Sequence, residues 1–207
     1  MCTKLKDEVI TSVSCGWEHS IATSLEQNCY SWGNNESGQC GIGTTAPIIF
    51  NPIKIEGLIN VKNISCGNDH SLALNYNGEV YSWGKSEGGI LGYKDNEFEY
   101  SPRLIPNLSN IDDICCGSLH NLALTKEGIL YSWGCGEGGQ LGHTEEFLLN
   151  EDSTGCITYP SVIQHLKHTK VIKISCGEAH SVALTYDGKV YGWGFNSSGQ
   201  LGFGNIL

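Results

Sequence analysis

The sequence predicts an all-β protein built from four β-propeller blades. Three observations predict it: one motif returns about every 50 residues, glycine occupies 27 of 207 positions, and no segment of ten or more residues shows a clear helical period. A period near 50 is typical of propellers and solenoids, and four short strands per period make up one propeller blade. The glycine content, roughly twice the ordinary level, indicates many turns.

The repeated motif is Cys-Gly-x-x-His, followed in each copy by Tyr-x-Trp-Gly. A fold element occurs in every repeat, whereas a catalytic or cofactor-binding loop occurs only once for each active or binding site. We therefore expect the residues that recur in every copy to be structural. The repeat signature consists of Gly16, His19, Trp32, Gly67, His70, Trp83, Gly117, His120, Trp133, Gly177, His180 and Trp193.

Each repeat is expected to contain four strands in chain order. The first precedes the Gly of the motif, the second begins at the His and is apolar, and the third ends at Trp-Gly. Short apolar runs bounded by turn residues are typical of strands. The fourth strand follows a glycine-rich loop and begins at a proline, which places it at 52–55, 102–105 and 160–163.

The turn between the second and third strands carries Asn77-Gly78 in one repeat and Asp187-Gly188 in another. These pairs predict tight hairpins with type I′ turns, in which both central residues have positive φ. The first repeat has Gln27 where the other repeats have glycine, which argues against a two-residue turn in that hairpin.

The combined signature of Cys-Gly-x-x-His-Ser, Val-Tyr-x-Trp-Gly and Gly-Gln-Leu-Gly resembles the regulator of chromosome condensation repeat family. The resemblance covers nearly the whole chain and implies blades of a typically seven-bladed propeller. Four copies would form a partial or incomplete seven-bladed propeller, with 1–207 as a single repeat region. The expected repeats are about 8–58, 59–108, 109–168 and 169–207, and the last lacks its fourth strand.

Two patterns have chemical as well as structural interpretations. The stretch 131–142 fits the G-x-G-x-x-G pattern of dinucleotide loops, but three sister stretches do not. The Cys and His of the motif are spaced for a zinc pair or a thiolate–imidazole dyad, yet each pair would lie on its own blade. We prefer a buried His bonded to backbone groups at the start of a strand. No catalytic residue, metal site or cofactor is expected.

The net charge and the cysteines limit the kinds of partner and the compartment that we expect. The net charge of −10 and the pI near 5.0 argue against nucleic acid and favour a basic protein partner. No apolar signal-peptide core or membrane segment is present. The ten cysteines include no C-x-x-C pair, so we expect reduced thiols in an intracellular protein, nuclear or cytoplasmic.

Two acidic loops with apolar centres are the candidate partner-binding segments, because function in rigid scaffolds tends to reside on loops. The longer one lies where the spacing between repeats increases. The alternative is that both are plain variable loops. The candidates are Asp95, Glu97, Phe98, Glu99, Glu145, Glu146, Phe147, Glu151 and Asp152.

The resemblance implies three functions. The first is a protein-interaction propeller module. The second is a guanine-nucleotide exchange factor for a small Ran-like GTPase, which needs no catalytic triad because it acts by differential binding. The third is a repeat fragment of a multidomain ubiquitin ligase or kinase. Unpaired propeller edges also predict self-association.

Overall fold

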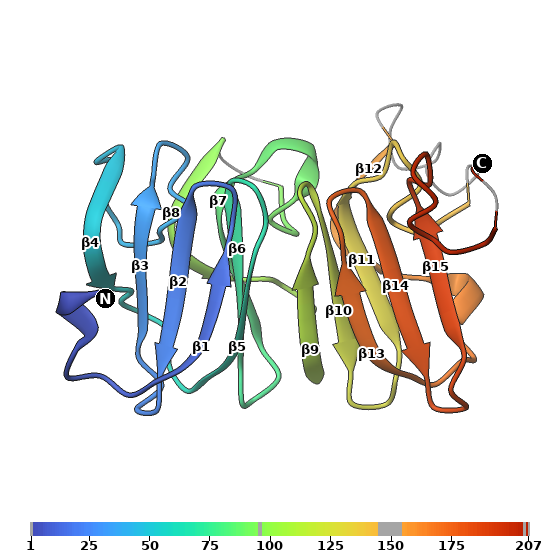
Figure 1. Ribbon diagram of the computed structural model, residues 1–207, viewed down its shortest axis with the longest axis horizontal. Coiled ribbons are helices and arrows are strands. Elements are labelled where there is room, and N and C mark those ends of the chain that lie inside the picture. Colours follow the sequence, from blue (N-terminus) through green and yellow to red (C-terminus); the bar gives the residue numbers. More distant parts are fainter. Residues whose placement is uncertain (1, 95–96, 145–154, 205, 207) are drawn as a thin grey trace. The chain divides into compact units, whose positions relative to one another are not determined.

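A computed structural model describes residues 2–94, 97–144, 155–204 and 206 (Figure 1). Antiparallel sheets make up nearly all of its regular structure, which confirms the all-β prediction. In the described part of the chain, the helical segments are three short 3-10 helices, η1 (Thr3–Leu5), η2 (Glu87–Gly89) and η3 (Gln164–Leu166). None of the described helices is long and apolar enough to span a membrane.

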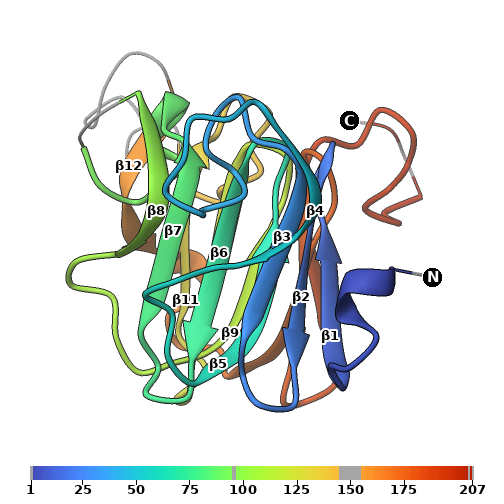
Figure 2. The same cartoon turned by 90° about the vertical axis from the view of Figure 1, so that its left-hand side faces the viewer.

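The chain divides into two compact units. The first unit comprises Met1–Glu87 and Asp95–Asn110 and holds two four-stranded sheets, whose strands pair in chain order. Figure 2 shows β1, β2 and β3 side by side in the first of them. Its strands are β1 (Ile10–Cys15), β2 (His19–Ser24), β3 (Cys29–Asn34) and β4 (Ile48–Lys54), followed by β5 (Val61–Cys66), β6 (His70–Asn75), β7 (Val80–Lys85) and β8 (Phe98–Leu104) in the second sheet.

The second unit comprises Gly88–Lys94 and Ile111–Leu207. Among the described residues, one sheet has four strands and the other has three. The strands are β9 (Ile111–Cys116), β10 (His120–Thr125), β11 (Leu130–Cys135) and β12 (Cys156–Val162), followed by β13 (Val171–Cys176), β14 (His180–Thr185) and β15 (Val190–Gly194).

The core of each unit lies between its two sheets. Every residue of β6 and of β10 is buried, as expected for strands covered on both faces. In the first unit Trp83 packs into a cluster with Ile21 and Ile64, and in the second Trp193 packs against a cluster that contains Leu124 and Ile174. The short apolar strands of the repeat therefore supply the interface between neighbouring sheets.

The hairpin turns differ from the predicted type I′ geometry. Gly78 has φ 81°, whereas Asn77 is not among the positive-φ residues. The amide of Gly78 donates to the carbonyl of Asn75 at 3.0 Å, which is the pattern of a three-residue loop with one left-handed bulge residue. Gln27 occupies the equivalent place with φ 64°. The first hairpin therefore has the same turn as the others, in spite of its missing glycine.

The outer strands begin earlier than predicted. β4, β8 and β12 each start four residues before the proline that was expected to open the strand. The pairing register shifts beside each proline, for example between Ser31 and Gly33 on β3. A bulge on an outer strand accommodates a residue that has no N–H to donate. The proline therefore lies inside the strand, at its bulge.

Candidate partner-binding surface

A shared carbonyl joins the two sheets of the first unit. The Nε2 atom of His19 lies 2.8 Å from the hydroxyl of Ser71, and that hydroxyl donates to the carbonyl of Gln39 at 3.0 Å. The indole of Trp83 donates to the same carbonyl at 2.9 Å. The His of one repeat, the loop after its third strand and the Ser and Trp of the next repeat thus meet at one point, which we call the joint.

The second unit contains the same joint. His120 is paired with Ser181 at 2.9 Å, and both Ser181 and Trp193 donate to the carbonyl of Gln140, at 2.9 and 2.8 Å. A third carbonyl, that of Ile90, accepts the indole of Trp133 and the amide of Asn121 at 2.9 and 2.8 Å. The repeated His and Trp are therefore engaged in packing the sheets.

These contacts bear on the chemical alternatives for the motif. The His19 bond goes to a side chain of the next sheet and not to the backbone groups expected from the sequence. Burial raises the pKa of the Cys66 thiol to about 12, so a thiolate is strongly disfavoured there. No cluster of three or more metal-ligating side chains occurs within the described ranges.

Two glycines are required by the joint. A Cβ at Gly16 would lie 2.1 Å from Cε1 of His19, so any side chain would displace the imidazole ring. Gly41 has φ +67°, and a Cβ there would lie 2.5 Å from the indole nitrogen of Trp83. The glycines of Cys-Gly-x-x-His and of the loop after Trp-Gly therefore make room for the His and Trp rings.

A chain of polar side chains runs across the loop end of the first unit. The amide of Asn34 donates to Glu18 at 3.0 Å, and the amide of Gln39 donates to Asn34 at 3.0 Å and to Asp69 at 3.4 Å. Gln39 is itself buried. The two carboxylates, one on each sheet, are thus held by a network anchored in the same loop that supplies the joint carbonyl.

The loop end is acidic and carries an exposed aromatic residue. Burial raises the pKa of Asp69; Lys85 opposes this effect, and the nearby charges of Glu18 and Glu36 add to it. The side chain of Trp17, next to Glu18, is 74% exposed. Carboxylates around an exposed indole can accept Lys or Arg side chains through ion pairs and cation–π contacts. We call Trp17, Glu18, Glu36 and Asp69 the acidic loop surface.

The sequence did not single out this surface as a candidate site. Trp17 and Glu18 fill the two variable positions of the first Cys-Gly-x-x-His motif, and Asp69 fills one of them in the second. In the second unit these positions hold Ser118-Leu119 and Glu178-Ala179. The sequence feature that could have indicated this surface is therefore the set of residues at the two variable positions of the motif, which differs between the repeats.

Only part of the predicted candidate loops falls on described residues. Glu97 is exposed, Phe98 and Glu99 begin β8, and Glu99 lies 3.9 Å from Arg103. The ring of Phe98 lies 6.4 Å from that of Tyr100. These contacts hold two of the three residues against their own strand. The other candidates lie outside the described residues: Asp95, Glu145, Glu146, Phe147, Glu151 and Asp152.

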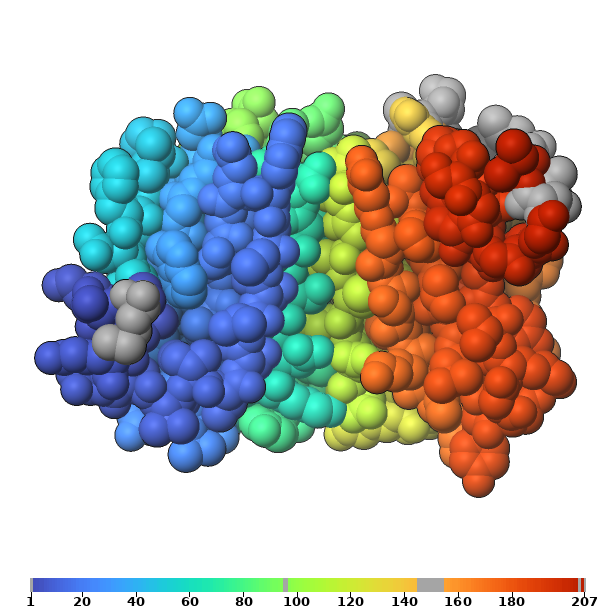
Figure 3. Space-filling view, in the orientation of Figure 1, coloured from blue at the N-terminus to red at the C-terminus, as the bar shows by residue number. Residues whose placement is uncertain are grey.

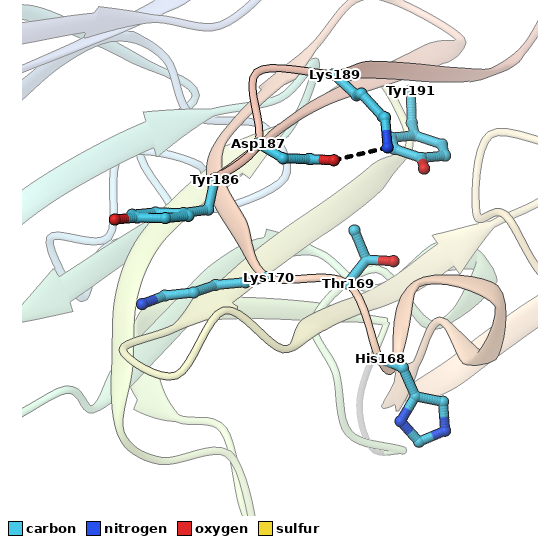
Figure 4. A pocket seen from close by; sticks show the side chains of 7 residues that line it. All are labelled: His168, Thr169, Lys170, Tyr186, Asp187, Lys189 and Tyr191. Carbon is cyan, nitrogen blue, oxygen red and sulfur yellow. Dashed lines mark ion pairs between the residues drawn. The ribbon is translucent and has the colours of Figure 1, made fainter.

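A pocket of about 320 Å³ lies at the end of the last sheet where β13 begins and β14 turns into β15 (Figure 4). The Lys170 ammonium lies 5.0 Å from the centre of the Tyr186 ring, and Lys189 forms an ion pair of 2.7 Å with Asp187. His168, Thr169 and Tyr191 complete the lining. Both lysines of the pocket are thus engaged by side chains of the adjoining turn, 186–189.

Antiparallel sheets of three or four strands, joined by a repeated His–Ser and Trp–carbonyl contact, define a protein of the propeller-blade repeat class. The chain belongs to the family of the regulator of chromosome condensation (RCC1) repeat. One model of that repeat matches residues 26–74, 77–124 and 127–184. A second model of the same repeat matches residues 10–39, 61–89, 111–140 and 171–200.

Curated relatives contain this repeat region within longer chains. The human probable E3 ubiquitin-protein ligase HERC6 is 38% identical over 202 residues, which cover 96% of this chain and 20% of the relative. The ultraviolet-B receptor UVR8 of Arabidopsis thaliana is 34% identical over 200 residues, which cover 96% of this chain and 44% of the relative. The chain therefore spans less than half of either relative.

Solved structures show the same fold. Human WBSCR16 superposes with a TM-score of 0.83 at 27% identity, covering 97% of this chain and 51% of that one. Prp20p from Saccharomyces cerevisiae, whose structure was described with its binding properties to Gsp1p and histones, has a TM-score of 0.82 at 25% identity. That match covers 97% of this chain and 49% of Prp20p.

Proposed function

We propose that this RCC1-type repeat region is a protein-interaction module whose first unit binds a basic protein through the acidic loop surface. The observation that carries the proposal is the hydrogen-bonded chain from Glu18 through Asn34 and Gln39 to Asp69. Because the network fixes the carboxylates before binding, less conformational entropy is lost when a cationic partner is bound.

Charge and surface chemistry support a basic partner. The chain carries 22 acidic and 12 basic side chains, so its field attracts positively charged proteins and repels nucleic acid. Exposed Trp is enriched among the residues that dominate binding energy at interfaces. Trp17 beside Glu18 therefore supplies an aromatic anchor next to a charge. The likeness to Prp20p, which was described with its binding to histones, adds support.

The test uses core histones as the basic probe. Binding is measured by fluorescence anisotropy for the chain, for Glu18→Lys/Glu36→Lys and for Trp17→Ala. The two charge reversals are expected to weaken binding about tenfold, since each converts an attraction into a repulsion. Trp17→Ala is expected to weaken it by a similar factor, and added salt should weaken binding by the parent chain.

The matched control is Glu26→Lys/Glu56→Lys. Both residues are exposed, and they follow β2 and β4 at the opposite end of the same sheet. The control changes net charge by the same amount, so it separates a local surface from a general effect of charge. Equal losses in the two double variants would show that histones respond only to net charge and would refute the proposed surface.

Guanine-nucleotide exchange is a second candidate function. It is favoured by the likeness to Prp20p, whose structure was described with its binding properties to Gsp1p. An exchange factor would accelerate release of fluorescent GDP from a small Ran-like GTPase at micromolar concentrations of the chain. Unchanged release rates across a panel of small GTPases would leave the binding module as the function.

A repeat region of a ubiquitin ligase is a third candidate, supported by the 38% identity to HERC6. In such a chain, the module would bind a protein and the ligase activity would reside elsewhere. Fusion of this region to a ligase domain should direct ubiquitin to histones, and the Glu18→Lys/Glu36→Lys fusion should lose that transfer. Equal ubiquitin transfer by both fusions would argue against a recruiting role for the acidic loop surface.

We also propose self-association through the last sheet. Val190, Tyr191 and Phe195 are exposed on or beside β15. The orange and red segments near the end of the chain lie on the face seen in the space-filling view (Figure 3). Exposed apolar side chains on an outer strand favour pairing between chains. Light scattering should give a mass that rises with concentration above 22.4 kDa. A constant mass at that value would refute self-association.

A further inference from the structure

Two cysteines face each other where β11 ends and β12 begins. Cys135 and Cys156 are register partners in the antiparallel pair, and their sulfurs lie 3.4 Å apart, with the Cys156 thiol donating to Cys135. The equivalent pairs in the first unit are Asn34 with Ile48 and Lys85 with Phe98. The thiol pair is therefore specific to this sheet and is not part of the repeat.

The surroundings of the pair favour a reaction between the two sulfurs. Cys156 is buried and Cys135 is half-buried. A Cβ at Gly88 would lie 2.4 Å from the Cys135 sulfur and 3.4 Å from that of Cys156, so the backbone of the second unit closes one side of the pair. A small oxidant needs less space at the sulfurs than the thiol of another protein does.

We propose that Cys135 and Cys156 form a reversible intramolecular disulfide when the chain meets hydrogen peroxide. The Cys135 sulfur attacks one peroxide oxygen, an S–O bond forms, the O–O bond breaks, and the departing hydroxide takes the thiol proton as water. The Cys156 sulfur then attacks the sulfenic acid, an S–S bond forms, the S–O bond breaks and a second water leaves. Two thiols lose two electrons to one peroxide, and two waters are produced.

The geometry assigns the two roles. Cys135 is the more exposed of the two residues, and its sulfur accepts the hydrogen bond from Cys156, which stabilises negative charge on the attacking atom. Cys156 already points its thiol at Cys135 and acts as the resolving residue. Closure shortens the sulfur–sulfur distance from 3.4 Å to about 2.05 Å, which is within reach of small side-chain rotations.

A second close pair of cysteines in the same unit has a different role. The Cys115 sulfur accepts the backbone amide of Cys176 at 3.0 Å, and in the first unit the hydroxyl of Ser14 accepts the amide of Cys66 at 3.1 Å. Cys115 thus takes the place of a serine as a hydrogen-bond acceptor between sheets. Replacing Cys115 with Ser preserves that acceptor and removes one thiol of this second pair.

Peptide mapping of the unmodified chain tests the proposal. The protein is treated with hydrogen peroxide, remaining thiols are alkylated, and trypsin releases the peptide 127–167, which contains both cysteines. We expect this peptide to lose two hydrogens. After digestion with a glutamate-specific protease, the fragments that carry Cys135 and Cys156 should stay joined, and reduction should separate them. Alkylation of both cysteines, or links to other cysteines, would refute the proposal.

Variants separate the proposed roles. In Cys156→Ser, sulfenic acid should accumulate at Cys135 and be trapped by dimedone, whereas in Cys135→Ser no dimedone adduct should form at Cys156. Cys115→Ser is the control and should give the parental yield of the disulfide. A large loss of disulfide in that control, or a dimedone adduct on Cys156 alone, would overturn the assignment of attacking and resolving sulfurs.

Discussion

His19 and Ser71 are 52 positions apart in the chain, yet the imidazole Nε2 and the Ser71 hydroxyl lie 2.8 Å from each other in a buried contact. The same hydroxyl donates to the carbonyl of Gln39. One small side chain therefore connects the second strand of one sheet, the loop of that sheet and the second strand of the next. Loss of this hydroxyl should weaken the packing of the two sheets.

Ser71→Ala is expected to lower the free energy of unfolding by about 2 kcal/mol, because two buried hydrogen-bonding groups lose a partner. The control is Ser20→Ala, at the equivalent position of the first repeat, where the hydroxyl is only half-buried and lies 3.8 Å from the Cys15 sulfur. That change should cost less than about 0.5 kcal/mol. Urea denaturation measures both, and equal costs would contradict the role given to Ser71.

Gly41→Ala should destabilise the first unit more than Gly57→Ala. Both glycines have positive φ, +67° and +84°, but only at Gly41 would the added Cβ meet the Trp83 indole; at Gly57 nothing lies within 4 Å. The shared backbone strain is about 1–2 kcal/mol, and the clash adds about 1–3 kcal/mol. Thermal unfolding should show the difference, and equal melting temperatures would mean that Trp83 moves away without cost.

Gln27→Gly should stabilise the chain. Gln27 is a side-chain-bearing residue at φ 64°, and relief of the left-handed strain is worth about 1 kcal/mol after the added chain entropy of glycine. The reciprocal Gly78→Gln should cost a similar amount. Calorimetry should show melting temperatures that move in opposite directions, and a lower value for Gln27→Gly would indicate that the Gln side chain itself contributes to the turn.

Stability should fall as the pH falls from about 6.5 to about 4. Burial, with a smaller contribution from the charge of His70, lowers the pKa of His19 from 6.5 to about 4. Between these two pH values His19 is therefore protonated in the unfolded chain and neutral in the folded chain. The free energy of unfolding is therefore unaffected by His19 above pH 6.5, and uptake of this proton by the unfolded chain lowers it by up to about 3 kcal/mol at pH 4.

His19→Gln should reduce this pH dependence even if it lowers stability at pH 7. Urea denaturation at pH 4.5 and at pH 7 measures, for each variant, the difference in the free energy of unfolding between the two pH values. His168→Gln, which changes an exposed histidine, should leave the difference unchanged. An identical difference in the parent chain and in His19→Gln would show that His19 remains protonated in the folded state at pH 4.5.

The repeat was predictable because its spacing and its apolar strands depend on local sequence. The partner of His19 was not, since Ser71 lies in the next repeat and periodicity does not pair residues across sheets. The start of each outer strand is not predictable from its proline, because the bulge beside the proline keeps it inside the strand. Gln27 showed that pairing of the flanking strands imposes the turn on a less suitable residue.

The candidate surface was harder to predict. Trp17, Glu18 and Asp69 belong to a motif that the repeat logic treats as structural. The exposure of Trp17 and Glu18, and the network that links Glu18 to the half-buried Asp69, are therefore visible only in three dimensions. Glu97 is exposed as a loop residue should be, and Phe98 and Glu99 start an outer strand instead. The part of the prediction that concerns Glu145, Glu146 and Phe147 stays a prediction.

The acceptor at each joint is a main-chain carbonyl, and this has an evolutionary consequence. Gln39, Ile90 and Gln140 differ in side chain, yet each presents its carbonyl to a Trp indole. A substitution at these positions leaves the acceptor in place. Lineages can therefore diverge in the loops that face other molecules without losing the register between neighbouring sheets. Such a scaffold can acquire new recognition surfaces while its architecture is inherited intact.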